Sequence, residues 1–380
     1  MRGIRPLTEM AVPQKYPALT GVRAVGATVV FFDHLPLWPD LHITLNVLAF
    51  FFALSGFLIV RLYYEGVRLG SAWLTQYFVN RFARIYPVYA LLLTAAVLLG
   101  GGARPWVLVQ NYTLTHALFH GTPLLIAPSW SLTVEECFYF LAPLLMLLAH
   151  RGGFLAPFVL SCVLSAIALA VSRLGVAFLG TPAFVLSTTF FGHFVEFFAG
   201  VFLALVVMRQ ERHGSLSVAG CRRTLLGSVL VLMLIAAMVI VYRHRPLSAG
   251  AILLINNLVI PVPIALLYWG LIREDTVLAR LLSQPWARLL GRASYSFYLL
   301  HTLVIDYVGV PLLLPALGSR PLAAGLTCVV TWIIAIGLFV SYEEPVNVFI
   351  RRRLGSHSGS VRGATAGRGA ARSVPVGRPL

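Results

Sequence analysis

Residues 17–34 read PALTGVRAVGATVVFFDH, an apolar stretch that contains Arg23 and His34. On an α-helix the eleven-residue step between them is about three turns, so both side chains lie on one face and are about 16 Å apart along the axis. Ionisable groups within an apolar run usually face a bundle interior or a wet cavity. The stretch therefore predicts a membrane helix with a functional face. The alternative is that each side chain only extends toward an interface.

The composition places the whole chain in the membrane class. Of its 380 residues, 59% are hydrophobic and 11% are charged, and the mean hydropathy is +0.86, whereas soluble domains have about 25% charged residues. Most apolar runs reach the ~17–25 residues that a spanning helix needs. We predict an all-α polytopic protein with about ten transmembrane helices, near residues 19–37, 44–64, 85–101, 131–149, 153–173, 186–208, 224–242, 249–271, 292–314 and 321–341.

The distribution of basic residues predicts the orientation. With the N-terminus inside, the inner segments carry most of the 29 Lys and Arg residues, and the outer loops hold Arg104, Arg173, Arg243, Arg245 and Arg320. Because cytoplasmic segments of membrane proteins are enriched in Lys and Arg, we predict that both termini lie inside. The net charge of +16 then indicates contact with anionic lipids and not with nucleic acid. We expect the protein in the cell (inner) membrane.

The chain is predicted to contain one transmembrane domain over residues 1–350. Residues 351–380 are rich in Gly, Ser, Ala and Arg, a composition typical of a disordered tail. The four cysteines contain no CxxC pair, so the sequence predicts neither a disulfide framework nor a metal site. The segment 102–130 is interrupted by Gly and Pro and is predicted as an external loop, with a re-entrant course as the alternative.

Two polar groups outside the first run suggest further sites. Arg81 and Arg84 are three residues apart, so they share a helical face at the predicted inner surface and can present two guanidinium groups to phosphate groups. The alternative is that they only contribute to the positive-inside pattern. Glu135 and Glu136 lie beside Trp130 at the start of an apolar run and are candidates for handling protons or a hydroxyl group.

Several histidines have a polar residue at helical spacing. His116 and His120 are four residues apart in the predicted external loop, and we predict a surface position because two histidines make a weak metal site. His193 and Glu196 are three residues apart within an apolar run, so they can pair across one helical turn. Asp33 points about 100° away from His34 and is not expected to orient it.

Six segments resemble, in the same order, the acyltransferase 3 family of integral membrane acyltransferases, which acylate sugars and other acceptors. They are residues 17–34, 51–59, 81–87, 129–139, 291–301 and 342–345. The resemblance implies acyl-CoA as a cytoplasmic co-substrate, with acetyl-CoA as the default, and no permanently bound cofactor. It implies as acceptor a hydroxyl of an envelope saccharide, a lipid-linked glycan or a secreted glycosylated small molecule. His193 departs from the family pattern, which often has Arg at this position.

The resemblance also implies roles for particular residues. His34 matches the essential histidine and would take the proton of the acceptor hydroxyl, while Arg23 would orient the donor or stabilise charge on the thioester oxygen. Arg81 and Arg84 would hold the CoA phosphates. Seven residues are implied at the acceptor side or as cavity supports, and the last of them is the rival general base: Ser55, Trp130, Glu135, Glu136, Tyr295, Tyr298 and His301.

A proton-coupled transporter or exporter of an anionic solute is the alternative function. In that case Arg23, His34, His193 and Glu196 would relay protons or bind the solute within the membrane. The Arg81 and Arg84 pair and the six family segments favour the enzyme.

Overall fold

The computed structural model describes residues 15–36, 43–67, 70–214, 220–244 and 248–355. Over these ranges the chain is helical, without any strand, and has one isolated β-bridge between Phe119 and Phe178. Nine of the helical segments described are long and apolar enough to cross a membrane. The predicted all-α polytopic fold is therefore confirmed.

The first half of the chain forms seven α-helices with short 3-10 turns between some of them. Their bounds are α2 Pro17–His34, α3 Thr44–Tyr63, α4 Ser71–Leu99, α5 Pro105–Tyr112, α6 Trp130–Gly152, α7 Leu155–Val171 and α8 Pro182–Thr188. The segment between α4 and α6 contains α5 and two 3-10 turns, η2 His116–Leu118 and η3 Ala127–Ser129. At 8 residues, α5 is too short to cross a membrane.

The second half contains the remaining α-helices and two π-helical segments. Their bounds are α9 Phe190–Arg212, α10 Arg222–His244, α11 Ala249–Val259, α12 Pro261–Arg273, α13 Val277–Leu282, α14 Pro285–Val304, η5 Ile305–Leu313, α15 Leu314–Leu317, α16 Arg320–Leu338, η6 Phe339–Glu343 and α17 Glu344–Gly355. The π segment η6 continues α16 into α17, so this span has an irregular turn near its C-terminal end, a feature common near functional sites.

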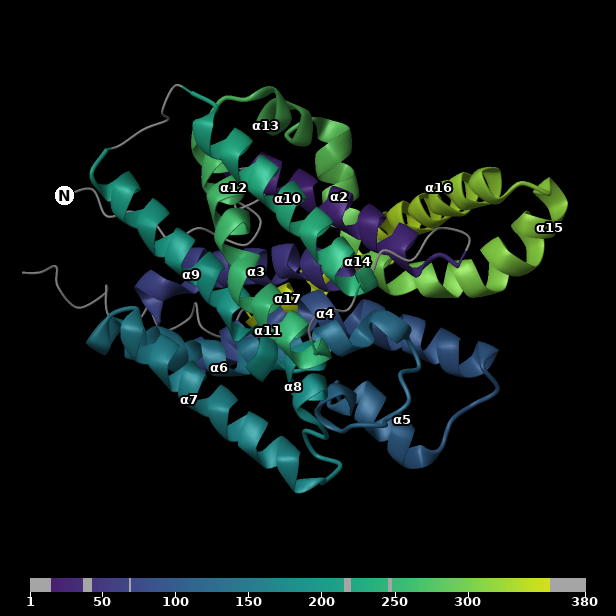
Figure 1. The fold of residues 1–380 in the computed structure, drawn as a ribbon, viewed down its shortest axis with the longest axis horizontal. Helices are drawn as coiled ribbons and strands as arrows, with labels where there is room; N and C mark the ends of the chain where they lie inside the picture. Colours follow the sequence, from purple (N-terminus) through teal and green to yellow (C-terminus); the bar gives the residue numbers. More distant parts are fainter. Residues whose placement is uncertain (1–14, 37–42, 68–69, 215–219, 245–247, 356–380) are drawn as a thin grey trace, which may run out of the picture.

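Helix α2 corresponds to the first predicted run but is not among the nine apolar segments. Its 18 residues include Arg23, Asp33 and His34, which make it less apolar than the other spans. It nevertheless packs against α3, α12, α13, α14 and α16, so it lies within the bundle (Figure 1). By contrast, α7 and α10 are the least buried spans.

The predicted span at 85–101 begins too late. Helix α4 runs without interruption from Ser71, so Arg81 and Arg84 lie inside a helix of 29 residues and not in a loop before it. The reason is packing: Trp73 and Tyr77 in the first turns of α4 contribute to the largest hydrophobic cluster, which extends the helix beyond its most apolar part.

Two prolines inside spanning helices each leave one backbone carbonyl without its helical hydrogen bond. In both cases a side chain of another helix donates to that carbonyl. Pro87 has no N–H for the carbonyl oxygen of Ala83, which instead accepts a hydrogen bond from Asn347 Nδ2 at 3.1 Å. Pro143 in α6 frees the carbonyl four residues earlier, and the Tyr77 hydroxyl donates to it at 2.8 Å. Such compensation is required where water is excluded.

The folded domain extends beyond its predicted end. Helix α17 continues to Gly355, past the predicted boundary between residues 350 and 351. Arg351 Nη2 donates to the backbone carbonyl of Asn80 at 3.5 Å, which ties this part of α17 to α4. The rest of the predicted tail, residues 356–380, lies outside the described residues.

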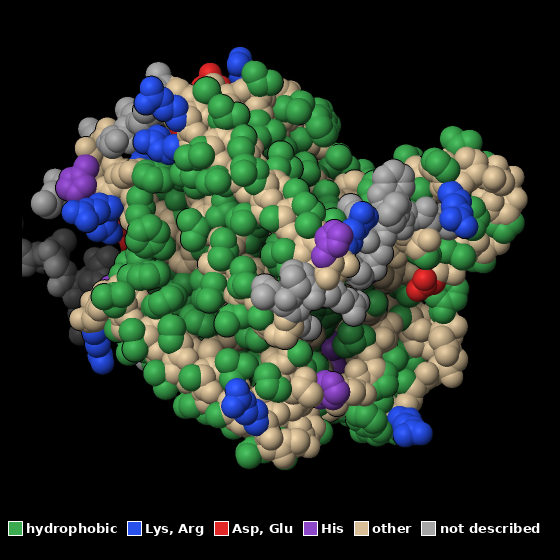
Figure 2. Space-filling model, viewed as in Figure 1, with side chains coloured by type: hydrophobic (Ala, Val, Ile, Leu, Met, Phe, Trp, Pro, Cys, Tyr) green, Lys and Arg blue, Asp and Glu red, His purple; other side chains and the backbone are tan. Residues whose placement is uncertain are grey.

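The face of the molecule shown in Figure 2 is dominated by hydrophobic side chains, while Lys and Arg side chains gather mainly toward its edges. Large apolar side chains are exposed along α7, α10 and α16. Since a soluble protein does not expose apolar area on this scale, this surface is the one that contacts lipid.

Helices α3 and α9 cross in close contact because each has a glycine at the crossing. A Cβ atom on Gly200 would lie 1.8 Å from the carbonyl oxygen of Ala53, and one on Gly56 would lie 2.1 Å from that of Phe197. Neither helix can accommodate even a methyl group there without separating.

We expect Gly200→Ala to lower the stability of the fold by about 1–3 kcal/mol, because the added methyl group overpacks the crossing. The midpoint of thermal unfolding in detergent measures the loss. Gly325→Ala is the matched control: this helical glycine has open space around its Cβ position, so the substitution is expected to be neutral or slightly stabilising. Equal midpoints for the two variants would contradict the close crossing.

Candidate functional site

A cavity of about 50 Å³ lies within the bundle, between α2, α3, α6 and α14. Its apolar walls come mainly from α3. Its polar walls contain one basic group, one acidic group and five hydroxyl groups, contributed by Arg23, Ser55, Ser131, Glu135, Ser294, Tyr295 and Tyr298. Five of these are residues that the sequence singled out, and the fold brings them together from four helices.

Opposite charges meet in this cavity. Arg23 Nε donates a hydrogen bond to Ser294 Oγ at 3.2 Å. Glu135 Oε1 accepts from the hydroxyl groups of Ser55 and Tyr139. The Glu135 carboxylate and the Arg23 guanidinium group thus line one small space, and each is hydrogen-bonded to neutral hydroxyl groups. This arrangement suits a polar, uncharged group between them.

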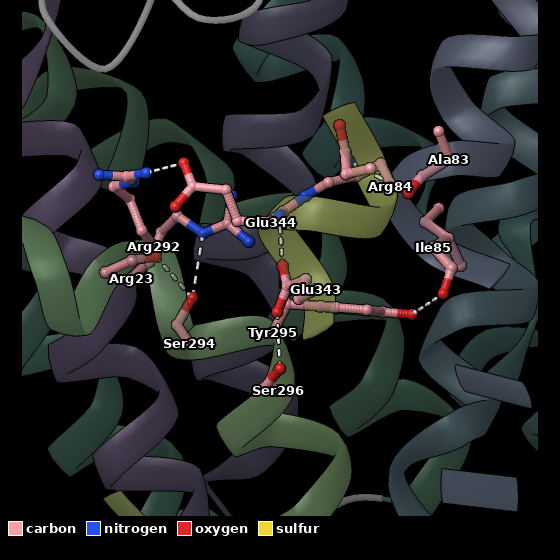
Figure 3. A network of polar contacts seen from close by, with 12 residues as sticks. Arg23, Ala83, Arg84, Ile85, Arg292, Ser294, Tyr295, Ser296, Glu343 and Glu344 are labelled. Carbon is pink, nitrogen blue, oxygen red and sulfur yellow. Dashed lines mark hydrogen bonds and ion pairs between the residues drawn. The ribbon is translucent and has the colours of Figure 1, made fainter. Parts of the chain in front are cut away.

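Two tyrosines of α14 form one wall of the cavity. Tyr298 OH lies 2.8 Å from Ser131 Oγ and donates to the carbonyl oxygen of Pro128 at 3.1 Å. Tyr295 OH donates to the carbonyl oxygen of Ile85 at 2.8 Å (Figure 3). The hydroxyl group of each tyrosine is therefore fixed by a hydrogen bond to a backbone carbonyl of another segment.

Arg81 lies close to the cavity. Its side chain is buried, with its guanidinium carbon 5.2 Å from the centre of the Tyr139 ring and 5.7 Å from that of Tyr63. Since the Tyr139 hydroxyl donates to Glu135, Arg81 is connected to the cavity through a single side chain. The position is more buried than the surface position that the sequence predicted.

Arg84 is part of a network of ion pairs between α4, α14 and the α16–α17 junction (Figure 3). Its Nη1 atom is 2.5 Å from Glu343 Oε1, and Glu343 Oε2 accepts from Ser296 Oγ at 2.6 Å. The neighbouring Glu344 pairs with Arg292. The Glu343 side chain is only 2% exposed, while the Arg84 side chain is 26% exposed. Arg84 therefore pairs with a buried carboxylate and is itself partly accessible from the surface.

His34 and His301 lie next to each other at the other end of α2 and α14. His301 Nε2 is 3.4 Å from His34 Nδ1, and the ring centroids are 5.1 Å apart. Neither histidine ring lines the cavity, but Tyr298 does, and its ring centroid is 5.8 Å from that of His301. Asp33 turns away, as expected, and accepts hydrogen bonds from Thr44 at the start of α3.

Trp130 and Glu136 lie outside the cavity walls. The Trp130 ring is 5.8 Å from the ring of His193. His193 and Glu196 pair across one turn as predicted: Nδ1 lies 3.1 Å from both carboxylate oxygens, and Nε2 lies 3.0 Å from the carbonyl oxygen of Ser187. A carbonyl oxygen only accepts, so Nε2 carries a proton in this pair.

His116 is buried, which corrects its predicted surface position. Its Nε2 atom lies 3.2 Å from Ser129 Oγ and 3.4 Å from Thr133 Oγ1, at the start of α6, because the α5–α6 segment folds back over this helix end. His120, by contrast, is exposed, so the two do not form a pair. Burial lowers the pKa of His116 from its ordinary value of 6.5 to about 4.

Four polar residues of the site were not predicted from the sequence. Ser131 and Tyr139 lie within the family segment 129–139 and Ser294 lies within the segment 291–301, where their hydroxyl groups were the available signal. Glu343 lies in the segment 342–345, and a carboxylate at the end of an apolar run was a signal for a buried counter-ion. The spacing of residues along the sequence does not show which arginine the Glu343 carboxylate pairs with.

Comparison with known proteins identifies the family. The family model described as an acyltransferase domain, acyltransferase 3, matches residues 16–340. This match covers most of the chain, so the chain belongs to the acyltransferase 3 family and is a multi-pass membrane acyltransferase. No curated protein and no solved structure matches the chain.

The buried His116 predicts a pH dependence of stability. Between pH 6.5 and about 4 the unfolded chain binds a proton at this side chain and the folded protein does not, so stability falls as the pH is lowered through this window. We expect a contribution of about 3 kcal/mol at most. Thermal unfolding at pH 7 and pH 4.5 should show a smaller loss for His116→Gln than for the wild type. An equal loss would contradict a neutral, buried His116.

Proposed function

We propose that this acyltransferase moves an acyl group, with acetyl as the default, from cytoplasmic acyl-CoA to a hydroxyl group on an envelope saccharide, a lipid-linked glycan or a secreted glycosylated small molecule. The observation that carries the proposal is the arrangement along α2 and α14: Arg23 contacts Ser294 in the polar cavity, and His34 contacts His301 about two turns of α14 further along. The basic inner end, the cavity and the histidines follow one another along these two parallel helices.

At the inner end, Arg84 would bind the phosphate groups of the donor. Its guanidinium group is partly exposed while its other side faces Glu343, and Arg292 lies in the same network. We assign Arg81 to the inner wall below the cavity, because its burial against Tyr139 leaves it better placed to attract the donor electrostatically than to coordinate a phosphate at the surface.

In the cavity, Arg23 would orient the donor. A space of about 50 Å³ suits a small acyl group or one or two water molecules and excludes a nucleotide. Because about 16 Å of helix separates Arg23 from His34, we assign Arg23 to the donor on its way to the reaction and not to the reacting thioester oxygen.

At the outer end, His34 would act as the general base. The acceptor oxygen attacks the thioester carbon as its proton moves to His34; the carbon–sulfur bond then breaks, and CoA leaves as the thiolate. General-base catalysis of this kind contributes about 10²–10⁴-fold to the rate. Tyr298 lines the cavity and contacts His301, whereas His34 does not line it, so the acyl carbon of the donor must move beyond the cavity walls to reach His34.

We expect His34→Ala to lower acyl transfer by about 10²–10⁴-fold, because the base is removed. The assay measures CoA release from radiolabelled acetyl-CoA by the purified protein, with and without an extract of envelope glycans from the host. His150→Ala is the matched control, since Nδ1 of this histidine also contacts the carbonyl four residues earlier, in a different part of the bundle. Transfer that persists in His34→Ala would remove the proposed base.

The same assay separates the enzyme from a transporter. If folded wild-type protein releases no CoA from acetyl or longer acyl donors in the presence of the extract, acyl transfer to these acceptors is excluded. Proton-coupled uptake into proteoliposomes then becomes the next measurement, because the intramembrane Arg23, His193 and Glu196 would suit a transporter as well.

The role of Arg84 in binding the donor predicts a change in KM. Arg84→Ala alone would leave Glu343 buried without its counter-ion, at a stability loss of about 3–5 kcal/mol. We therefore compare the double variant Arg84→Ala/Glu343→Gln with Glu343→Gln. The double variant is expected to have a KM for acetyl-CoA about 10–100-fold higher, since a charge-assisted contact to phosphate is lost, with a smaller change in kcat. Equal KM values would contradict phosphate binding by Arg84.

A further inference from the structure

His34 and His301, at the outer end of α2 and α14, form a hydrogen-bonded pair. The role of His34 as the proposed base does not by itself explain why His301 lies beside it. His301 is 1% exposed. Its ring stacks on Phe297 at an interplanar angle of 13° and lies 6.4 Å from the ring of Phe31. Phe297 in turn stacks on Trp332 of α16 at 3.9 Å. Three helices thus fix the His301 ring in place.

The hydrogen bonds of His301 determine where its proton lies. Nδ1 is 2.6 Å from the backbone carbonyl oxygen of Tyr298. A carbonyl oxygen can only accept, so Nδ1 carries the hydrogen. In the neutral ring, Nε2 is therefore an acceptor, and this is the atom that faces His34.

His34 faces two acceptors with the same ring nitrogen. Its Nδ1 atom is 3.0 Å from the carbonyl oxygen of Val30 and 3.4 Å from His301 Nε2. Because both contact atoms can only accept a hydrogen bond, His34 Nδ1 must carry the hydrogen and donate it. In the neutral ring the free lone pair is then on Nε2. The nitrogen that is free to take a proton from an acceptor hydroxyl is therefore Nε2.

A carboxylate usually orients a catalytic histidine, but here the neighbouring groups differ. On α2, Asp33 is engaged with Thr44 at the start of α3. On α14 the titratable neighbour of the pair is Tyr298, whose hydroxyl group bonds to Ser131 and Pro128. Among the described residues, no carboxylate is hydrogen-bonded to either ring, so His301 occupies the position of the orienting group.

We propose that His301 is the positioning residue of the general base: it holds His34 in the Nδ1-protonated form and strengthens its hydrogen bond when His34 takes up a proton. The inference rests on the proposed function. As the acceptor oxygen forms its bond to the acyl carbon, its proton moves to His34 Nε2; the electron pair of the carbon–sulfur bond leaves with CoA, whose thiolate or the solvent then takes the proton. The Nδ1–H bond to His301 becomes charge-assisted in this step, which is when such bonds shorten and strengthen.

Two substitutions separate positioning from packing. His301→Phe keeps an aromatic ring and removes the acceptor, whereas His301→Gln places an amide oxygen near the position of Nε2. In the assay with radiolabelled acetyl-CoA and envelope glycan extract, His301→Phe is expected to lower kcat about 10–100-fold, the effect of losing a hydrogen bond to a charged group, with KM for acetyl-CoA unchanged. His301→Gln is expected to recover most of kcat. The double variant His34→Ala/His301→Phe should be no slower than His34→Ala.

Several results would overturn the inference while leaving the proposed function intact: wild-type kcat in His301→Phe, equal losses in the Phe and Gln variants, or additive losses in the double variant. If wild-type protein transfers no acyl group, or His34→Ala is fully active, the proposed function itself fails.

A spectroscopic measurement tests the protonation of the His34 ring directly. It needs neither a variant of His301 nor an activity assay. In wild-type protein with ¹⁵N-labelled histidine, the His34 signals, assigned by their loss in His34→Ala, should show a protonated Nδ1 and an unprotonated Nε2 at a pH above the titration of the ring. A protonated Nε2 would overturn the inference, and it would do so even if the His301 variants failed to fold.

Discussion

The close packing of α2 against α14 is the constraint on which the rest of the site depends. Gly291 makes it possible, because a Cβ atom there would lie 1.9 Å from the carbonyl oxygen of Thr20. With the two helices parallel and in contact, Arg23 reaches a serine of α14 at one level and His34 reaches His301 at the next. A wider spacing would separate both pairs and open the cavity between them.

A second constraint comes from the surroundings of the bundle. In an apolar environment every polar group needs a partner within the protein, and the described helices meet this need largely with side chains from other spans. Asn347 and Tyr77 satisfy the carbonyls freed by two prolines, and Arg84 neutralises the buried Glu343. These contacts lock α4, α6 and the α16–α17 junction together, so the groups of the site are also the groups that orient the helices.

If the proposed function holds, the arrangement of polar groups along α2 and α14 would let one bundle handle two very different substrates. The ion pairs of Arg84 and Arg292 lie at one end, the cavity of about 50 Å³ follows, and the histidines lie at the other end next to Tyr298. Under the proposed function, this separation would keep the acceptor away from the charged part of the donor.

The sequence by itself determined the membrane class, the helical architecture, the family and five of the seven polar cavity residues, because hydropathy and helical periodicity depend on local composition and the family segments are contiguous. It misjudged the start of α4, the end of α17 and the burial of His116, all of which depend on packing between distant segments. Only the tertiary structure decided that the rival histidines His34 and His301 lie side by side and that Arg84 faces Glu343. Those pairings join residues more than 250 positions apart, and their geometry is set by the helix crossings and not by any local pattern.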